Sequence, residues 1–237
     1  MAYQSIFQRF EIKYLLTREQ KARIVAAMAP YMMPDSYGRS TIRNVYFDTS
    51  DYRLIRRSIE KPVYKEKLRL RSYRQAEGEQ PVFVEVKKKY KGIVYKRRLA
   101  LPLQQAEAWL CGGTPPGEDS QIRREIDHFL RFYGSLRPAV FLSYEREAWL
   151  GADDFRVTFD ENILCRRAAL SLAEPVGGMS LLAEGTVLME LKCSGGIPLW
   201  MTALLTQEKL YKTSFSKYGT AYQTLVYPEI KEDFSHV

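Results

Sequence analysis

Charged and apolar residues alternate with a period of two over much of this chain, and this alternation constrains its fold more than any other feature. In the run Lys-Glu-Lys-Leu-Arg-Leu-Arg at 65–71, a basic residue occupies every second position, and leucines lie between the last three of them. Side chains two residues apart on a β-strand point to the same face of the sheet. The run is therefore predicted to be a strand with one basic face and one largely apolar face.

Eight segments combine this alternation with the Val, Ile, Tyr, Phe and Thr content typical of strands. They are 5–16, 41–48, 63–74, 81–89, 93–101, 138–149, 154–163 and 186–193. Four other stretches have the spacing of helices. These are 17–32, 103–110, 120–133 and 199–226, the last in two pieces, and the first opens with the capping-box spacing of Thr17 and Gln20.

Most connections between the predicted strands are too short for parallel crossovers, notably 90–92 and 151–153. A largely antiparallel sheet is therefore favoured. Eight antiparallel strands with few helices suit a closed or nearly closed β-barrel, because closure removes exposed edges. Since no repeat or low-complexity segment interrupts the pattern, residues 1–237 are predicted to form a single α+β domain, with an eight-stranded antiparallel barrel and helices packed outside it.

Seven of the eight predicted strands carry a charged face, and Arg and Lys predominate on it. On a single strand such a face is commonly a solvated surface. The recurrence of cations on nearly every strand weakens that interpretation for the set. The alternating polar positions are Arg9, Glu11 and Lys13, then Lys65, Lys67, Arg69 and Arg71, then Glu85, Lys87 and Lys89, then Lys96 and Arg98, then Tyr144 and Arg146, then Arg156, Thr158 and Asp160, then Glu190 and Lys192.

The charge balance indicates a polyanionic partner, because 36 Lys and Arg residues face 28 Asp and Glu residues and leave a net charge of +8. If the apolar faces pack under helices, the charged faces line the barrel interior. Two like charges about 4 Å apart repel by roughly 4 kcal/mol at an effective dielectric near 20, so an anion would relieve this lining. Glu11, Glu85 and Glu190 would either pair with the cations or hold a hard divalent metal. The pattern predicts a basic tunnel for oligophosphate.

Several catalytic classes lack their motifs here. The chain has no P-loop pattern, no G-x-G-x-x-G, no H-E-x-x-H and no G-x-S-x-G. Its two histidines, His128 and His236, lie in a predicted helix and next to the last residue, so neither is a good general base. Catalysis is therefore expected to rest on Lys, Arg, Glu, Asp and Tyr.

The cysteines and the N-terminal sequence indicate a cytoplasmic protein. Cys111, Cys165 and Cys193 are far apart and form no C-x-x-C spacing, so neither a disulfide framework nor a structural zinc site is expected. Residues 1–14 contain no apolar signal-peptide region, and the longest uncharged stretch, 193–207, is interrupted by Gly and Pro. We therefore expect no membrane span.

The ordered set of motifs resembles one protein family, the polyphosphate polymerase (VTC) domain of the triphosphate tunnel metalloenzyme, or CYTH-like, superfamily. The resemblance runs from the first strand nearly to the C-terminus. It rests on Arg9-Phe-Glu-Ile-Lys-Tyr14, Asn44-Val-Tyr-Phe-Asp-Thr49, Lys67-Leu-Arg-Leu-Arg-Ser-Tyr73, Val82-Phe-Val-Glu-Val-Lys87, Lys96-Arg-Arg98, Ser143-Tyr-Glu-Arg146, Arg156-Val-Thr-Phe-Asp160, Met189-Glu-Leu-Lys192 and Phe215-Ser-Lys-Tyr218.

This resemblance implies an eight-stranded tunnel in which a nucleoside triphosphate and a growing polyphosphate chain lie among Lys and Arg side chains. The phosphate ligands that it implies are Lys13, Arg69, Arg71, Lys87, Lys96, Arg146 and Lys217, with hydroxyl contacts from Tyr144 and Ser216. It implies that Glu190 holds Mn²⁺ or Mg²⁺. The charged strands add Arg98, Arg156 and Lys192 as substrate-binding candidates and Glu11 and Glu85 as further metal-binding candidates.

The activity implied is transfer of the ATP γ-phosphate to a growing polyphosphate chain. Two alternatives stay open: a hydrolase of inorganic or nucleoside triphosphates on the same fold, and a module that binds polyphosphate without turnover. A nucleic-acid partner is not expected, because the basic residues lie on strands without the exposed aromatic residues that stack on bases.

Two positions depart from the patterns of related families. Many hydrolases and cyclases of the superfamily carry Glu-x-Glu-x-Lys on the first strand, whereas this chain has Arg9 at the first Glu position, which favours the polymerase branch. The eukaryotic polymerase domains tend to have a lysine where this chain has Ser214, and Lys212 is the candidate to compensate. Those proteins also add regulatory and membrane-spanning modules, which are not expected here, so membrane coupling would need a separately encoded partner.

Three other predictions concern residues that the resemblance does not place in the site. Asp48, in a Phe-Asp-Thr sequence at the end of a strand, is predicted to be a turn or cap residue. Lys88, Lys89 and Lys91 are predicted to form a solvated hairpin tip. His128 and the three tryptophans are expected to pack or to lie on the surface.

Overall fold

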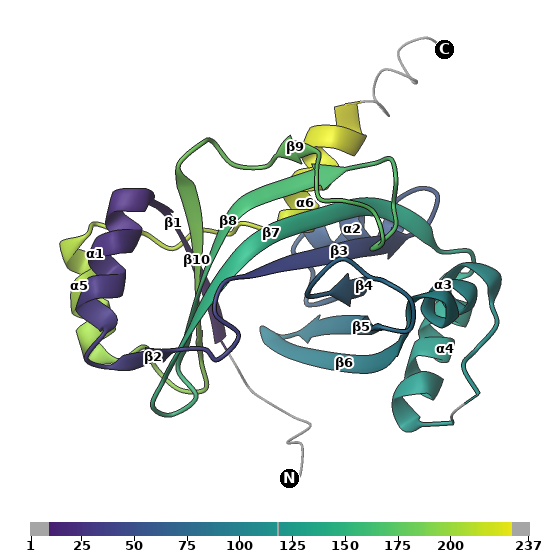
Figure 1. The fold of residues 1–237 in the computed structure, drawn as a ribbon, viewed down its shortest axis with the longest axis horizontal. Coiled ribbons are helices and arrows are strands. Elements are labelled where there is room, and N and C mark those ends of the chain that lie inside the picture. The colour runs from purple at the N-terminus through teal and green to yellow at the C-terminus, as the bar shows by residue number, and fades with distance from the viewer. Residues whose placement is uncertain (1–9, 118, 229–237) are drawn as a thin grey trace.

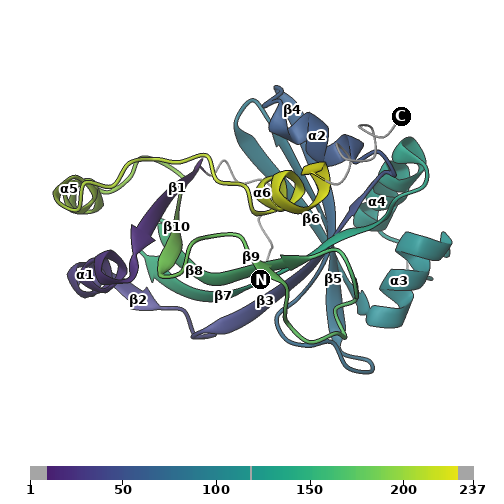
Figure 2. The ribbon, with the colours of Figure 1, turned by 90° about the horizontal axis from the view of Figure 1, so that it is seen from above.

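A computed structural model describes residues 10–117 and 119–228, and its main feature is one ten-stranded antiparallel sheet (Figures 1 and 2). The strand order is β1-β10-β8-β7-β3-β4-β5-β6, with β2 beside β7 and β9 beside β8. The long strands are β1 (Phe10–Thr17), β3 (Ser40–Asp48), β4 (Tyr64–Ser72), β5 (Pro81–Tyr90), β6 (Ile93–Pro102), β7 (Arg137–Gly151), β8 (Arg156–Arg166) and β10 (Thr186–Cys193), and the short ones are β2 (Met32–Pro34) and β9 (Met179–Ser180).

All eight predicted strands are present, and the part of the first one at 5–9 lies outside the described residues. The two short strands were not predicted, because two or three residues are too few to show a period. The β5–β6 connection is a two-residue turn in which Lys91 and Gly92 have φ of 46° and 87°. Positive φ at both positions is the signature of a type I′ hairpin turn. The predicted hairpin tip at Lys88, Lys89 and Lys91 is thus confirmed as a hairpin.

The apolar faces of β3 to β6 pack under the helices α3 (Leu103–Gly112) and α4 (Gln121–Tyr133). Trp109 and Phe129 from these helices are buried against Leu68, Leu70 and the valines of β5. Because β4 and β5 alternate, the opposite face of the same strands carries their charged residues. One face of the sheet is therefore held by packing and leaves the other face for the site.

A second core lies at the other end of the sheet, where α1 (Arg18–Met28) and α5 (Leu199–Gln207) cover β1, β10 and β8 (Figure 1). The helix α1 begins where the sequence predicts. Gln20 N donates to Thr17 Oγ1 at 3.2 Å, and Thr17 N donates to the side chain of Gln20 at 3.0 Å. This capping box satisfies donors that the first helical turn leaves without a partner.

The sheet curls into a barrel-like shape, but in the part of the chain that the structure describes no ladder joins the edge strands β1 and β6. Other contacts bridge this opening. Lys87 Nζ on β5 lies 2.9 Å from Glu11 Oε2 on β1. The segment 213–216 also reaches both sides, since Thr213 N donates to Lys13 O at 2.8 Å and Ser216 accepts from Lys67 of β4. The predicted α+β antiparallel fold is therefore confirmed, as a nearly closed barrel.

The helix α6 (Lys217–Ala221) and the following π-helical turn η1 (Tyr222–Val226) lie on the concave side, between the arms of the sheet in Figure 2. The Tyr218 ring stacks on Tyr46 with centroids 4.5 Å apart, and Tyr218 Oη donates to Asp48 at 2.8 Å. Apolar side chains of β3, β7 and β10 complete this cluster. The predicted two-piece helical region at 199–226 is confirmed, and its second piece enters the interior.

A short helix, α2 (Arg53–Ile59), was not predicted. Its N-cap Tyr52 has φ of 58° and provides no side-chain cap. Instead the carboxylate of Asp48 accepts hydrogen bonds from Leu54 N at 2.8 Å and Ile55 N at 3.0 Å. Asp48 thus serves as the predicted turn and cap residue, for a helix whose capping group lies outside the local sequence pattern.

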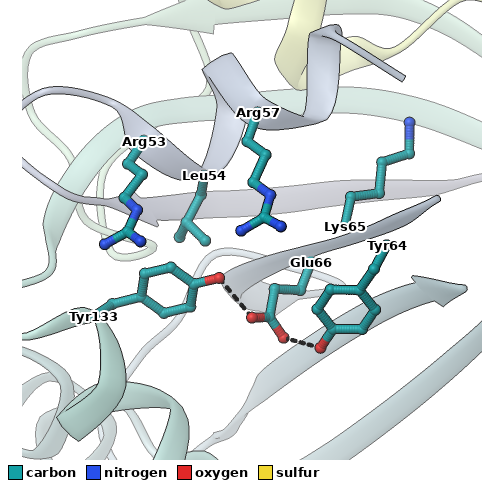
Figure 3. Close-up of a pocket in the computed structure, with 7 residues that line it drawn as sticks. All are labelled: Arg53, Leu54, Arg57, Tyr64, Lys65, Glu66 and Tyr133. Carbon is teal, nitrogen blue, oxygen red and sulfur yellow. Dashed lines mark hydrogen bonds between the residues drawn. The ribbon is translucent and has the colours of Figure 1, made fainter. Parts of the chain in front are cut away.

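The helix α2 also covers a small cavity of about 10 Å³, room for about one water molecule (Figure 3). Glu66 lies at its centre and accepts hydrogen bonds from Tyr64 Oη at 2.6 Å and Tyr133 Oη at 2.5 Å. Figure 3 shows Lys65 pointing away from Glu66, as alternation on β4 requires. Burial and the Glu66 carboxylate raise the pKa of both tyrosines, which stay protonated donors.

Replacing Tyr133 with Phe is expected to lower the free energy of unfolding by about 1.5–3 kcal/mol, because a buried carboxylate loses a hydrogen bond from a neutral donor. Urea unfolding measures this change. Tyr37→Phe is the matched control, since Tyr37 is 83% exposed and its hydroxyl is free to bond to water. Equal stability of the two variants would show that the Glu66 contact does not hold α4 to β4.

No helix in the described part of the chain is long and apolar enough to cross a membrane.

The tryptophans pack as predicted: Trp109 is buried, and Trp149 and Trp200 lie against the α1–α5 core. His128 is exposed on α4 and contacts Phe132.

Candidate active site

The concave face of the sheet gathers the charged side chains predicted to line a tunnel. In the strand register, Arg69 lies opposite Glu85, which lies opposite Arg98. On the other side of the opening, Lys13 lies opposite Glu190. These residues come from strands distant in sequence, and the alternation within each strand brings them to one face. The cations of this face are Lys13, Lys67, Arg69, Arg71, Lys87, Lys96, Arg98, Arg146, Lys192 and Lys217.

Glu85 organises the first group of cations and is only 1% exposed. Its Oε2 accepts from Arg69 Nε at 2.8 Å and Nη2 at 2.6 Å, and its Oε1 accepts from Arg98 Nε at 2.8 Å. Lys96 and Arg71 lie 3.9 and 4.0 Å from the carboxylate. Burial alone would raise the pKa of Glu85, but Arg69 and the other cations hold it well below its ordinary value. Glu85 is therefore a permanent buried anion that anchors two arginines.

Aromatic side chains hold the same two arginines from other directions. Arg69 Nη1 donates to Tyr46 Oη at 3.3 Å, and Arg98 Nη2 donates to Tyr73 Oη at 2.7 Å. The Arg98 guanidinium also lies 4.3 Å from the centre of the Phe83 ring. A guanidinium restrained in this way loses less rotamer freedom when it binds an anion.

Asp160 on β8 organises the second group and is fully buried. It accepts a bidentate pair of hydrogen bonds from Arg146 Nε at 2.6 Å and Nη2 at 2.7 Å, and it forms a close ion pair with Lys217 of α6. Burial would raise the pKa of Asp160, but Arg146 and Lys217 lower it to about 2. Asp160 thus places two predicted phosphate ligands beside each other.

Glu190 and Glu11 make the remaining ion pairs. Glu190 lies 3.0 Å from Lys192, 3.6 Å from Lys13 and 3.9 Å from Arg146. The pKa of Glu190 is well below its ordinary value, because these cations outweigh its burial. Among the residues that the structure describes, no three Asp, Glu, His or Cys side chains gather into a group that could hold a metal ion. The three predicted metal-binding carboxylates, Glu11, Glu85 and Glu190, all pair with cations here.

Two hydroxyl groups lie among these cations. The Tyr144 ring centre is 4.5 Å from Lys217 Nζ and 5.0 Å from Arg146 Cζ. Burial raises the pKa of Tyr144, but the cations overcome this and lower it to about 8. Ser216 caps α6, and its Oγ accepts from Gly219 N and from Lys67 Nζ, both at 3.2 Å. The turn into α6 therefore delivers Ser216 and Lys217 to the charged face.

Three other residues raised by the sequence lie apart from these groups or outside the described structure. Arg156 lies opposite Lys192 in the register, but its guanidinium donates to Asp35 at 2.7 Å. Lys212, the residue considered as a replacement for a lysine at Ser214, is exposed. Arg9 lies outside the described residues.

Asp160 and Lys67 belong to the site but were not among the residues predicted to form it. Both stand on the charged faces of predicted strands, so position alone could have found them. Asp160 was overlooked because a carboxylate in a basic tunnel has no evident role until Arg146 and Lys217 are seen to share it. Lys67 was overlooked because its partner, Ser216, is 149 residues away.

The arrangement is suited to an extended polyanion. Cations outnumber carboxylates on the concave face, and each buried carboxylate orients arginines or lysines. Arginine forks bind phosphate oxygens bidentately, and lysines add point charges. The phosphate oxygens of an extended chain would therefore accept hydrogen bonds from successive Arg and Lys side chains along this face.

Comparisons with known proteins agree with this geometry. The family model described as the VTC domain matches residues 8–226. A crystal structure of a candidate adenylate cyclase from Bacillus halodurans has a TM-score of 0.56 and 15% identity, covering 90% of this chain and 96% of that one. A candidate adenylyl cyclase from Hippeastrum with a dominant triphosphatase activity also has a TM-score of 0.56 and 15% identity, covering 91% and 95%. At this identity the likeness shows a shared fold. No curated protein sequence matches the chain.

Proposed function

The chain belongs to the VTC domain family, and we propose that it is a polyphosphate polymerase that transfers the γ-phosphate of ATP to the end of a polyphosphate chain. The observation that carries this proposal is the excess of oriented cations on the concave face. Glu85 orients Arg69 and Arg98, and Asp160 orients Arg146 and Lys217. Donors for phosphate oxygens are therefore spread along the concave face and are not gathered at one point.

The reaction requires little covalent chemistry from the protein. An oxygen of the terminal phosphate of the chain attacks the γ-phosphorus of ATP, the bond from that phosphorus to the β-phosphate bridging oxygen breaks, and ADP leaves with the bonding electrons. Catalysis of this kind depends on positioning and on neutralising charge. The proposed ligands are Lys13, Arg69, Arg71, Lys87, Lys96, Arg98, Arg146, Lys192 and Lys217, with hydroxyls from Tyr144 and Ser216. Arg156 is left out of this set because its guanidinium is paired with Asp35.

A divalent metal, Mn²⁺ or Mg²⁺, fits this site as a companion of the substrate. The described residues offer single carboxylates beside lysines, and no ready group of three ligands. Mg²⁺ is commonly held by one or two carboxylates together with substrate phosphates and water. We assign Glu190 as the carboxylate that would hold this metal. Glu190 lies opposite Lys13 in the strand register, and Glu11 is two residues before Lys13 on β1. When bound, the metal would neutralise phosphate charge.

Hydrolysis of a triphosphate is the second candidate, because the Hippeastrum structure of the same fold has a dominant triphosphatase activity. Water would then replace the chain end as the attacking group, and orthophosphate would be released. Against this candidate, the one histidine within the described residues, His128, lies on α4 away from the concave face and is not placed to act as a general base for water.

Incubation of the purified chain with ATP and Mn²⁺ or Mg²⁺ separates the candidates. We expect polyphosphate chains of increasing length on a gel stained for polyphosphate, with ADP formed in step with the phosphate incorporated. Orthophosphate without chains would replace the polymerase with the hydrolase. Binding of polyphosphate without ATP consumption would instead assign the chain to a binding role.

A further inference from the structure

Lys67 lies on the concave face of β4 and has no role in the function proposed above. Its Nζ donates to Ser216 Oγ at 3.2 Å and lies 5.8 Å from the centre of the Tyr218 ring. Among the residues that the structure describes, Lys67 forms no ion pair with a carboxylate. A hydroxyl group can orient an amine, but it cannot neutralise its charge.

The groups that face Lys67 from β4, β5, β1 and the turn into α6 are cations, a hydroxyl and an aromatic ring. Lys65 and Arg69 flank it on β4, Lys87 lies opposite it on β5, and Lys13 approaches from β1. The turn into α6 adds Ser216 and the ring of Tyr218. On β3, Asp48 lies one register step beyond the Phe47–Leu68 pair, but its carboxylate already accepts hydrogen bonds from Tyr218 Oη and from the first turn of α2. Lys67 is thus surrounded by like charge on three strands.

Three of its cationic neighbours differ from Lys67 because each of them pairs with a carboxylate. Lys13 pairs with Glu190, Lys87 with Glu11, and Arg69 with Glu85. These three carboxylates therefore already have cationic partners within the protein. Burial and the surrounding cations, Lys13 first, lower the pKa of Lys67 to about 7.

Such a position costs stability in the empty protein. Lys67 is half-buried, so its ammonium form loses part of its hydration and is repelled by its neighbours. An uncharged side chain of similar length would be better tolerated there. The placement is favourable only when an anion from outside the protein lies among these cations.

We propose that Lys67 is a further phosphate-binding residue of the tunnel, whose amine takes a phosphate oxygen of the bound polyanion as the counter-ion that the described protein residues do not supply. The proposal rests on the polyanion-binding function proposed above, and it adds a proton to that binding step. The amine takes this proton from the buffer, donates to a phosphate oxygen, and remains oriented by Ser216.

The proton gives the proposal a measurable signature. At pH 8 an amine with a pKa of about 7 is mostly neutral, whereas an amine beside several phosphate oxygens is charged. Tripolyphosphate binding should therefore take up close to one proton at this residue. Arginine at position 67 would be charged in both states and would take up none.

The experiment is calorimetric titration of the full chain with tripolyphosphate at pH 8, in two buffers that differ in ionisation enthalpy. We compare wild type, Lys67→Arg and Lys67→Gln. Wild type is expected to take up about one proton more than Lys67→Arg for each ligand bound. Lys67→Gln is expected to bind at least about tenfold more weakly, while Lys67→Arg stays within a fewfold of wild type.

Thermal unfolding distinguishes this role from a structural one. Lys67→Gln is expected to raise the Tm of the free protein, because it removes a half-buried amine that has no counter-ion and that folding shifts toward its neutral form. A residue kept for packing would instead lower Tm when replaced. Lys91→Gln, in the exposed hairpin turn, is the matched control and should change neither Tm nor binding.

Equal proton uptake by wild type and Lys67→Arg would overturn the proposal, and so would unchanged affinity of Lys67→Gln. Both results leave polyanion binding itself intact. Failure of the wild-type chain to bind tripolyphosphate would overturn the proposed function, and the role of Lys67 with it. If Lys67→Gln does not fold, the comparison of wild type with Lys67→Arg still decides the outcome.

Discussion

Arg69→Ala is expected to reduce polyphosphate synthesis by about 100-fold or more, a loss of the size seen when one preorganised donor to a transition state is removed. Arg69 is bonded to Glu85 through Nε and Nη2 and to Tyr46 through Nη1, so its position in the site is closely defined. Initial rates of chain formation from ATP measure the change, with product length read on the same gels.

The same variant should also be less stable. Removing one partner of a buried ion pair commonly costs roughly 3–5 kcal/mol, and the lower end applies here because Glu85 keeps Arg98. Arg69→Lys restores the charge without the fork, so it should recover stability more than activity. This split between stability and activity separates binding of substrate from support of the fold.

Arg97→Ala is the matched control for Arg69→Ala. Arg97 also pairs with one glutamate, Glu125 of α4 at 2.9 Å, but it lies on the outer face of β6. A partly exposed pair of this kind contributes less than about 1 kcal/mol. Synthesis by Arg97→Ala should match wild type. If Arg69→Ala also matches wild type, the concave face is not the site of the reaction.

The strands and their charged faces were predictable because alternation is a local property. Any four residues of 65–71 show which side chains share a face, and no distant contact is needed to read it. The helix α2 was not predictable for the opposite reason. Its first turn is capped by Asp48, four residues before Tyr52, so no N-cap residue marks its start in the sequence.

The composition of the site was largely predictable, but its pairing was not. Alternation placed Lys87 and Glu11 on charged faces, but their 2.9 Å contact joins strands that are not neighbours in the sheet. The position of α6 depends on the stacking of Tyr218 on Tyr46, a contact across 172 residues that no local pattern encodes. The pairing of cations with carboxylates therefore required the three-dimensional register.

Asp160→Asn tests that register most directly, because Asp160 is fully buried and shared by two cations. The amide keeps the shape of the side chain and removes its charge. Arg146 and Lys217 would then lose their common anchor and repel each other. We expect a loss of roughly 3–5 kcal/mol in the free energy of unfolding at neutral pH. Polyphosphate synthesis should fall by about 100-fold or more, since two proposed phosphate ligands move.

The pH dependence of the loss identifies its cause. The pKa of Asp160 falls from 3.8 to about 2 on folding, so its contribution to stability is complete above about pH 5 and is lost as the pH falls toward 2. Over this range the contribution is about 2 kcal/mol, at 1.36 kcal/mol for each unit. The difference in stability between wild type and Asp160→Asn should shrink by that amount between pH 5 and pH 2, as followed by urea unfolding.

Asp153→Asn is the matched control, because Asp153 is exposed and the same substitution there should leave the acid limb of the stability curve unchanged. A pH-independent difference between wild type and Asp160→Asn would mean that the variant is destabilised by altered packing and not by loss of the charge. In that case Arg146 and Lys217 should retain their positions and synthesis should recover in Asp160→Asn under stabilising conditions. Persistent loss of synthesis together with the shrinking difference would assign Asp160 the task of positioning both ligands by its charge.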